Sequence, residues 1–192
     1  MAHRRWVSWV FALGLLVIPA TAFAGPAEDV LKDKQSALIT ELKKGKATSA
    51  KVDEIFDSFI DYETLAQDSL GQYWGERSDQ EKKDFTELLK KLVRNAYRAN
   101  LKKTLKYDVE YKGEDQAKKG TLVKTVAKSK TNAREEPVSI DYAMHEGGGK
   151  WTVYDIVTEG SSLVGNYKSQ FARTIKKQGF PELMKKMKKK AG

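Results

Sequence analysis

In residues 151–171, WTVYDIVTEGSSLVGNYKSQF, a strand pattern runs directly into a helix pattern. Its first apolar residues fall on both sides of the expected strand: Trp151, Val153 and Val157 on one side, Tyr154 and Ile156 on the other. A strand that is apolar on both faces is expected inside a layered structure rather than at its edge. Apolar residues then recur at helical spacing, namely Leu163, Val164, Tyr167 and Phe171. We therefore expect a buried strand followed at once by an amphipathic helix.

Three more strand patterns precede this stretch. Apolar and polar residues alternate over 107–111, again over 121–128, and again over 138–145. The connections are short, and the one before Trp151 is a run of three glycines at 147–149. Strands that follow one another through short turns predict an antiparallel meander of about four strands.

Helix patterns lie on both sides of the meander. The expected helices are a first from Pro26 to Gly45, a second from Thr48 or Ser49, a short third over 62–70, a long fourth from Ser78 to Leu105, a fifth over 162–178 and a last that opens at Pro181. Ser78 and Glu81 form a capping box at the start of the long helix. Helices, a meander and helices again predict an α+β fold in which amphipathic helices cover the sheet.

The N-terminal 24 residues have the pattern of a secretory signal. Arg4 and Arg5 precede an apolar run over 6–20, and Ala22-Phe23-Ala24 fits a cleavage site. An uncleaved membrane anchor is the alternative, although the run is short for a membrane span. Cleavage leaves one domain, 25–192, and lowers the formal net charge from +9 to +7 by removing two arginines.

The composition leaves little material for catalysis. The chain has no cysteine, which excludes thiol chemistry, disulfides and thiolate metal sites. After the signal, His145 is the single histidine, and its strand phase favours a solvent-exposed position over a catalytic one. We therefore expect no catalytic residue, no metal site and no cofactor.

Two blocks of sequence carry a resemblance to a known family. The first is FIDYETLAQDSLGQYW over 59–74, followed by Glu81, Phe85, Leu88 and Tyr97. The second lies within 151–171 and includes Trp151, Val153-Tyr154-Asp155, Glu159-Gly160, Ser162-Leu163-Val164, Asn166-Tyr167 and Gln170-Phe171. Together they resemble the MlaC family, also called the toluene-tolerance family, over nearly the whole of 25–192. Ser161 departs from the pattern, because the family usually has an apolar residue there.

The resemblance implies a periplasmic phospholipid carrier rather than an enzyme. Such proteins shuttle phospholipids between an outer-membrane lipoprotein complex and an inner-membrane ABC transporter with an MCE-domain component, and so maintain outer-membrane lipid asymmetry. The family fold buries the acyl tails in an apolar cavity between the sheet and its helices. Nothing in the sequence demands more than a monomer.

A soluble carrier needs a dry apolar pocket, because exposing about 30 methylene groups at ~0.8 kcal/mol each would cost on the order of 20 kcal/mol. Apolar and aromatic residues of the sheet and helices are our candidates for lining it: Tyr73, Trp74, Leu88, Leu92, Tyr97, Val109, Val123, Ile140, Tyr142, Val153, Ile156, Leu163, Tyr167 and Phe171. The spacing of each residue also fits an ordinary position in the hydrophobic core. Asp155 needs a partner in this apolar strand, and we expect its role to be structural.

The basic end of the chain has two interpretations. The last helix pattern ends in Lys185, Lys186, Lys188, Lys189 and Lys190. Lysines are favourable at a helix C-terminus in any protein. They also suit transient contact with anionic membrane surfaces or acidic partners.

Two other classes of function are weighed against a lipid carrier. A small exported enzyme on a cone-shaped helix-plus-sheet scaffold would need a polar dyad in its cavity, and only Asp155 with a tyrosine is available. A nucleic-acid binder would fit the positive charge, but acidic residues interrupt most basic stretches, so we expect no nucleic-acid partner.

Overall fold

The structure, a computed structural model, describes residues 25–45 and 49–192, apart from the side chain of Lys102. The expected signal, residues 1–24, lies outside the described residues. The helices are α1 (Pro26–Lys43), α2 (Ala50–Asp57), α3 (Tyr62–Leu70), the 3-10 turn η1 (Gly71–Tyr73), α4 (Asp79–Thr104), α5 (Leu163–Gln178) and α6 (Phe180–Ala191). The strands are β1 (Tyr107–Ala117), β2 (Gly120–Ser129), β3 (Val138–Gly147), β4 (Lys150–Thr158) and β5 (Ser161–Ser162).

Side-chain caps set where the helices begin. Asp61 accepts a hydrogen bond of 2.9 Å from the Thr64 backbone amide at the start of α3. Ser78 and Glu81 form the predicted capping box of α4. Ser162 accepts from the Gly165 amide at 2.8 Å, so α5 begins immediately after the last strand.

The sheet is an antiparallel meander in the order β1-β2-β3-β4-β5. This confirms the predicted α+β fold and adds a fifth strand of two residues. Gly148 and Gly149 have φ values of 57° and 74°, which suits glycine in the tight turn between β3 and β4.

A bulge in β4 corrects our assignment of its faces. The register pairs Val153 with Met144 and Ile156 with Tyr142, and Tyr154 is the extra residue between them. Because Tyr142 and Met144 are two apart on β3, Val153 and Ile156 lie on the same face of the sheet. The predicted separation of these two residues was wrong, because strict alternation along the sequence does not allow for a bulge.

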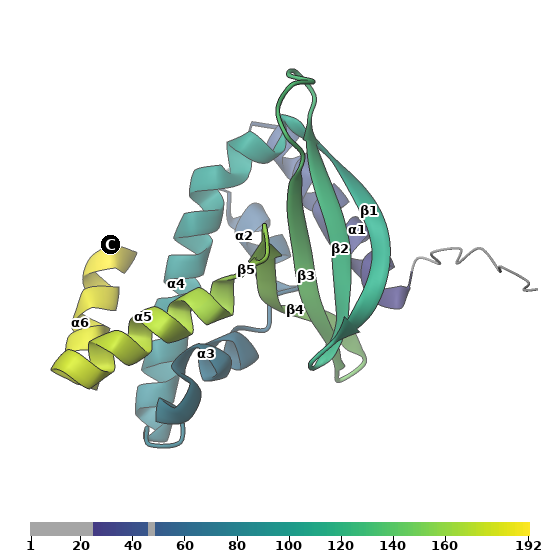
Figure 1. Cartoon of the computed structure of the whole chain (residues 1–192). Coiled ribbons are helices and arrows are strands. Elements are labelled where there is room, and N and C mark those ends of the chain that lie inside the picture. The colour runs from purple at the N-terminus through teal and green to yellow at the C-terminus, as the bar shows by residue number, and fades with distance from the viewer. Residues whose placement is uncertain (1–24, 46–48) are drawn as a thin grey trace, which may run out of the picture.

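The helices form a layer against one side of the sheet (Figure 1). α1 contacts β1 and β2, whereas α3 and α5 contact β4. α4 is the long central helix of this layer and packs against α3 and α6. Its buried Phe85 meets Phe171 of α5 edge-on, with 5.5 Å between the ring centroids. No helix in the described ranges is both long and apolar enough to cross a membrane.

Candidate functional site

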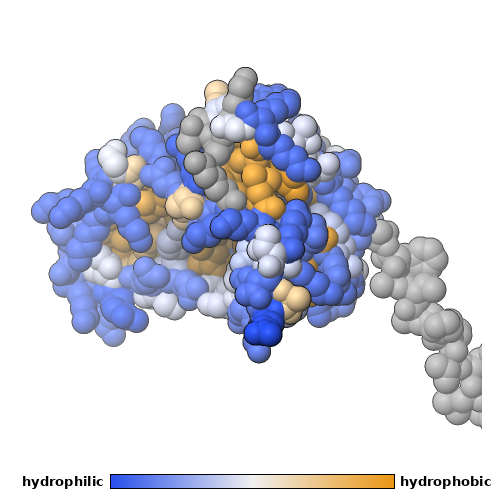
Figure 2. Space-filling model, turned by 90° about the horizontal axis from the view of Figure 1, so that it is seen from above, coloured by the Kyte–Doolittle hydropathy of each residue, from blue (hydrophilic) through white to orange (hydrophobic). Residues whose placement is uncertain are grey.

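An apolar cavity of about 590 Å³ lies between the inner face of the sheet and helices α1, α2, α4 and α5. Seen from above, apolar atoms are visible in a hollow that hydrophilic side chains border in part (Figure 2). Its volume is within the usual range for small-molecule sites, roughly 300–1,000 Å³. Most of the wall is aliphatic or aromatic, with contributions from every layer of the fold: Leu38, Ile39, Leu42, Phe56, Phe59, Val93, Ala96, Tyr97, Val109, Ala127, Val138, Ile140, Tyr142, Ile156, Leu163 and Tyr167.

Each wall of the cavity has small side chains beside larger ones. On α4, Ala96 presents only a methyl group beside Tyr97, whose ring stacks on Phe56 at a centroid distance of 3.9 Å. On the sheet, Ala127 stands opposite Val109 in the strand register. Val109 is 36% exposed, although it belongs to the cavity wall. An exposed apolar wall of this kind is typical of a surface that a ligand covers.

A small polar group interrupts the apolar wall near α1. The Tyr111 hydroxyl donates a hydrogen bond of 2.6 Å to Oε1 of Gln35, and Gln35 also bonds the Tyr142 hydroxyl. Burial raises the pKa of Tyr142 and the bond to Gln35 lowers it, and the net result is a pKa raised to about 12. Burial likewise raises the pKa of Tyr97. These phenols are therefore neutral at pH 7 and serve as hydrogen-bonding groups.

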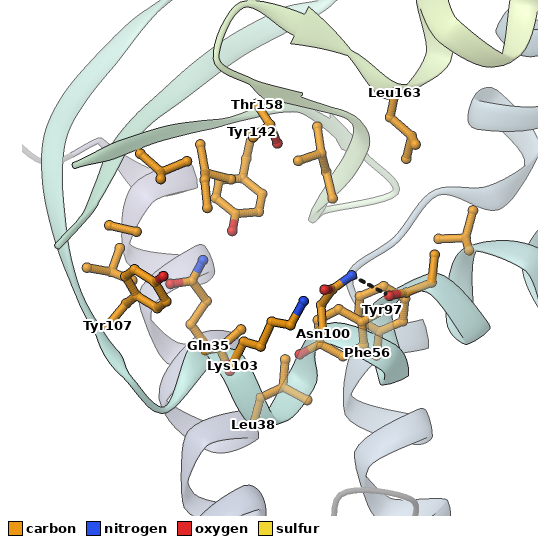
Figure 3. Close-up of a pocket in the computed structure, with 18 of the residues that line it drawn as sticks. Gln35, Leu38, Phe56, Tyr97, Asn100, Lys103, Tyr107, Tyr142, Thr158 and Leu163 are labelled. Atoms are coloured by element: carbon orange, nitrogen blue, oxygen red, sulfur yellow. Dashed lines mark hydrogen bonds between the residues drawn. The ribbon is translucent and has the colours of Figure 1, made fainter. Parts of the chain in front are cut away.

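The cavity wall is nearly free of charge. Among its described residues, Lys103 is the only one with an ionisable group that is charged at neutral pH, and none is an acid or a histidine. Figure 3 shows the Lys103 side chain extending into the space between Asn100 and Tyr142. Elsewhere in the described ranges, no three histidine, aspartate or glutamate side chains gather closely enough to hold a metal ion. This arrangement suits burial of an apolar ligand.

Half of the predicted lining residues reach this cavity, and half do not. Those in its wall are Tyr97, Val109, Ile140, Tyr142, Ile156, Leu163 and Tyr167. Those outside it are Tyr73, Trp74, Leu88, Leu92, Val123, Val153 and Phe171. Val123, Val153 and Phe171 are buried in the core, where Val153 bridges to Ile60 ahead of α3. Core and cavity share one apolar layer, so periodicity cannot distinguish them.

Several cavity residues were not among the candidates. α1 contributes Leu38 and Leu42, the α2 region contributes Phe56 and Phe59, and the polar Gln35, Asn100 and Lys103 also belong to the wall. The apolar faces of these helices were visible in the sequence. α1 and α2 close the cavity because of how the chain packs, and local sequence patterns do not predict this packing.

His145 is less exposed than we predicted. Its side chain is 24% exposed, and Nε2 lies 2.8 Å from Oδ2 of Asp61. The ring also sits beside Tyr154, with 5.2 Å between the centroids. The prediction of a solvent-exposed histidine is corrected, because the N-terminal end of α3 covers this part of β3. His145 is not part of the cavity wall.

Asp155 has the structural partners that we expected. Its carboxylate accepts hydrogen bonds from the amides of Ile156 at 2.8 Å and Val164 at 3.0 Å, and from the Ser162 hydroxyl at 2.5 Å. The side chain thus ties β4 to the first turn of α5. Ser161, the residue that departs from the family pattern, is exposed, lines the cavity and accepts a bond of 3.0 Å from Asn166.

The fold and the site together define an α+β protein with an apolar ligand cavity between a meander sheet and a layer of helices. A family profile described as MlaC protein matches residues 28–189, and the chain belongs to this family. A similar solved structure is the phospholipid-binding protein from Ralstonia solanacearum in complex with a phospholipid, with a TM-score of 0.73 and 23% identity. The similarity covers 87% of this chain and 97% of that one, and supports the fold. No curated protein matched the sequence.

Proposed function

We propose that this protein binds phospholipid and holds the acyl tails in the cavity between the sheet and helices α1, α2, α4 and α5. The observation that carries the proposal is a continuous apolar wall around about 590 Å³ that opens to the surface. Membership of the MlaC family and the similarity to a phospholipid-binding protein support it. The tails gain the free energy of leaving water, and the headgroup stays at the opening.

The further role that we propose is carriage without chemical change. The protein would be exported by its N-terminal signal and work in the periplasm, between an outer-membrane lipoprotein complex and an inner-membrane ABC transporter with an MCE-domain component. Such shuttling would maintain the lipid asymmetry of the outer membrane. The described wall of the cavity offers no acid–base pair, so nothing in it favours the alternative of an exported enzyme.

We also propose that the lysines of α6 dock on membranes or on acidic partners. Lys185, Lys186, Lys188, Lys189 and Lys190 are all exposed. The opposite face of α6 buries Phe180, Leu183 and Met187. The lysine side chains therefore form a cationic surface on a helix that is anchored to the rest of the fold.

Mass spectrometry of detergent-free protein tests the proposal first. The protein should carry phospholipid under native conditions and lose the added mass after organic extraction. Protein that is free of lipid and that also takes up none from vesicles would refute the proposed function. The number of chains per lipid would also show how the cavity is filled.

A further inference from the structure

We propose that Lys103 binds the phosphate of the lipid headgroup at the opening of the cavity, and that this contact makes the protein prefer anionic to zwitterionic phospholipids. The inference rests on the proposed function, since it needs the acyl tails in the cavity. It goes further by assigning a residue and a headgroup preference.

Lys103 lies where the cavity wall meets solvent. Lys103 lies in the last turn of α4, which ends at Thr104. Lys103 is an exposed residue, and its side chain also belongs to the cavity wall and extends into the space in Figure 3. Asn100, one turn earlier, also lines the cavity. When the tails of an amphiphile are buried, its charged end must lie at the boundary between the apolar wall and solvent. Lys103 is a cation at this boundary.

Lys103 has no carboxylate partner among the described residues, whereas several cations nearer the middle of α4 do. Arg94 and Arg98 bond to Asp57 and Asp53 of α2, respectively. Lys90 also lies 3.5 Å from Asp57. The acids of α2 thus neutralise the middle of α4. In the described wall of the cavity no acid opposes Lys103, so its charge is available to a ligand.

A helix C-terminus favours a lysine in any protein, and this accounts for a cation at the end of α4. It does not account for a side chain that lines an apolar cavity. An ammonium close to low-dielectric surface attracts a phosphate more strongly than one fully in water. A zwitterionic headgroup brings its own ammonium, which repels Lys103 and competes for the same phosphate. A glycerol headgroup brings none, and this difference is the source of the preference.

The test is competitive loading from vesicles. Delipidated protein is incubated with vesicles of equal phosphatidylglycerol and phosphatidylethanolamine with identical acyl chains, re-isolated, and its lipid extracted and quantified. We expect the bound ratio to favour phosphatidylglycerol by about fivefold, the effect of roughly one surface charge contact. Because both lipids share one vesicle, general attraction of a basic protein to the membrane does not change the ratio.

Three variants make the test specific. Lys103→Gln should bring the ratio towards one, and Lys103→Arg should retain the preference. Lys91→Gln is the matched control, because Lys91 is an exposed α4 residue outside the cavity and the substitution removes the same charge. Gln is a good helix former, so folding should be preserved, as circular dichroism will check.

Each outcome decides between two ideas. A fully loaded Lys103→Gln protein with the parental ratio, or an equal loss of preference in Lys91→Gln, overturns the role of Lys103 alone. Absence of lipid from every form overturns the proposed function and this inference together. If inorganic phosphate at the concentration of the vesicle phosphate abolishes the preference, the site binds a free anion, and the assignment to a lipid headgroup is wrong.

Discussion

At the scale of single residues, the cavity depends on which side chains of β4 face the helices. Ile156 lines the cavity, and its neighbour Val157 does not. Both are β-branched, both are half-buried, and they are adjacent on the strand. They differ in the face of the sheet to which they belong, since Ile156 pairs with Tyr142 and Val157 with Asp141. This pair therefore separates an effect on the cavity from an effect on the strand.

We expect Ile156→Asn to weaken phospholipid binding by roughly fivefold to a hundredfold. An amide that loses water to an acyl chain without gaining a partner costs about 1–3 kcal/mol. The measurement is the transfer of a fluorescent phospholipid from vesicles, at several protein concentrations. Val157→Asn is the control and should bind within about twofold of the parent. Equal phospholipid binding by the two variants would mean that Ile156 does not contact the ligand.

At the scale of elements, one contact joins the start of α3 to β3. Asp61 caps α3 through the Thr64 amide and lies beside His145 of β3. Burial raises the pKa of Asp61, but hydrogen bonds from the amide and hydroxyl of Thr64 and the contact with His145 outweigh it, so the net pKa is lowered. A lowered carboxyl pKa stabilises the fold above the unfolded value, about 3.9, and this contribution is lost as the pH falls through the folded value.

Asp61→Asn tests this contact, because asparagine keeps the cap but removes the charge. We expect the variant to be less stable than the parent by about 1 kcal/mol at pH 6, measured by urea unfolding. The difference should shrink as the pH falls below the unfolded value, about 3.9, and through the lowered pKa of Asp61 in the folded parent. A difference that stays constant over this range would mean that the charge of Asp61 contributes nothing.

The last helix is a second element with a separable role. α6 packs on α4 and α5 through one face and exposes its lysines on the other. Replacing Lys188, Lys189 and Lys190 with glutamine should weaken co-sedimentation with anionic vesicles by roughly a hundredfold, at ~1 kcal/mol for each residue. The control replaces Lys83, Lys91 and Lys150, which are exposed elsewhere. If both triple variants lose the same amount of vesicle binding, the total charge determines binding and α6 has no special role.

In the molecule as a whole, a protein built around an apolar cavity is expected to be more stable with its ligand bound. Walls from both layers enclose the space, so a bound tail contacts the sheet and the helices together. Any ligand that binds only the folded state raises its stability, by about 2.7 kcal/mol when present at a hundred times its Kd. Release to a partner then requires a state that binds the lipid less tightly.

Removing the lipid should therefore lower Tm by ~5–10 °C for a domain of this size. Hydrogen exchange should become faster in the parts of α1 and α4 that line the cavity. It should be unchanged at the turn between β1 and β2, which lies outside the wall. If calorimetry and hydrogen exchange give the same results for lipid-bound and delipidated protein, the cavity is not the binding site.

Local sequence determined the elements and their order. Ser78 with Glu81, Asp61 before α3, and the glycines at 148–149 each act within a few residues of themselves, and the structure has the predicted helix starts and turn at these places. The family blocks likewise identified the family, because they preserve residue types in a set order.

Which apolar residues surround open space depends on how the layers pack together. Val153 and Ile156 lie on one face because β4 has a bulge at Tyr154, yet one is in the core and the other in the cavity. Gln35, Phe56 and Lys103 reach the cavity because α1, α2 and the end of α4 enclose it. Hydrophobic periodicity predicts that a side chain is shielded from solvent. Whether it then meets another side chain or a ligand depends on how far apart the two layers are held.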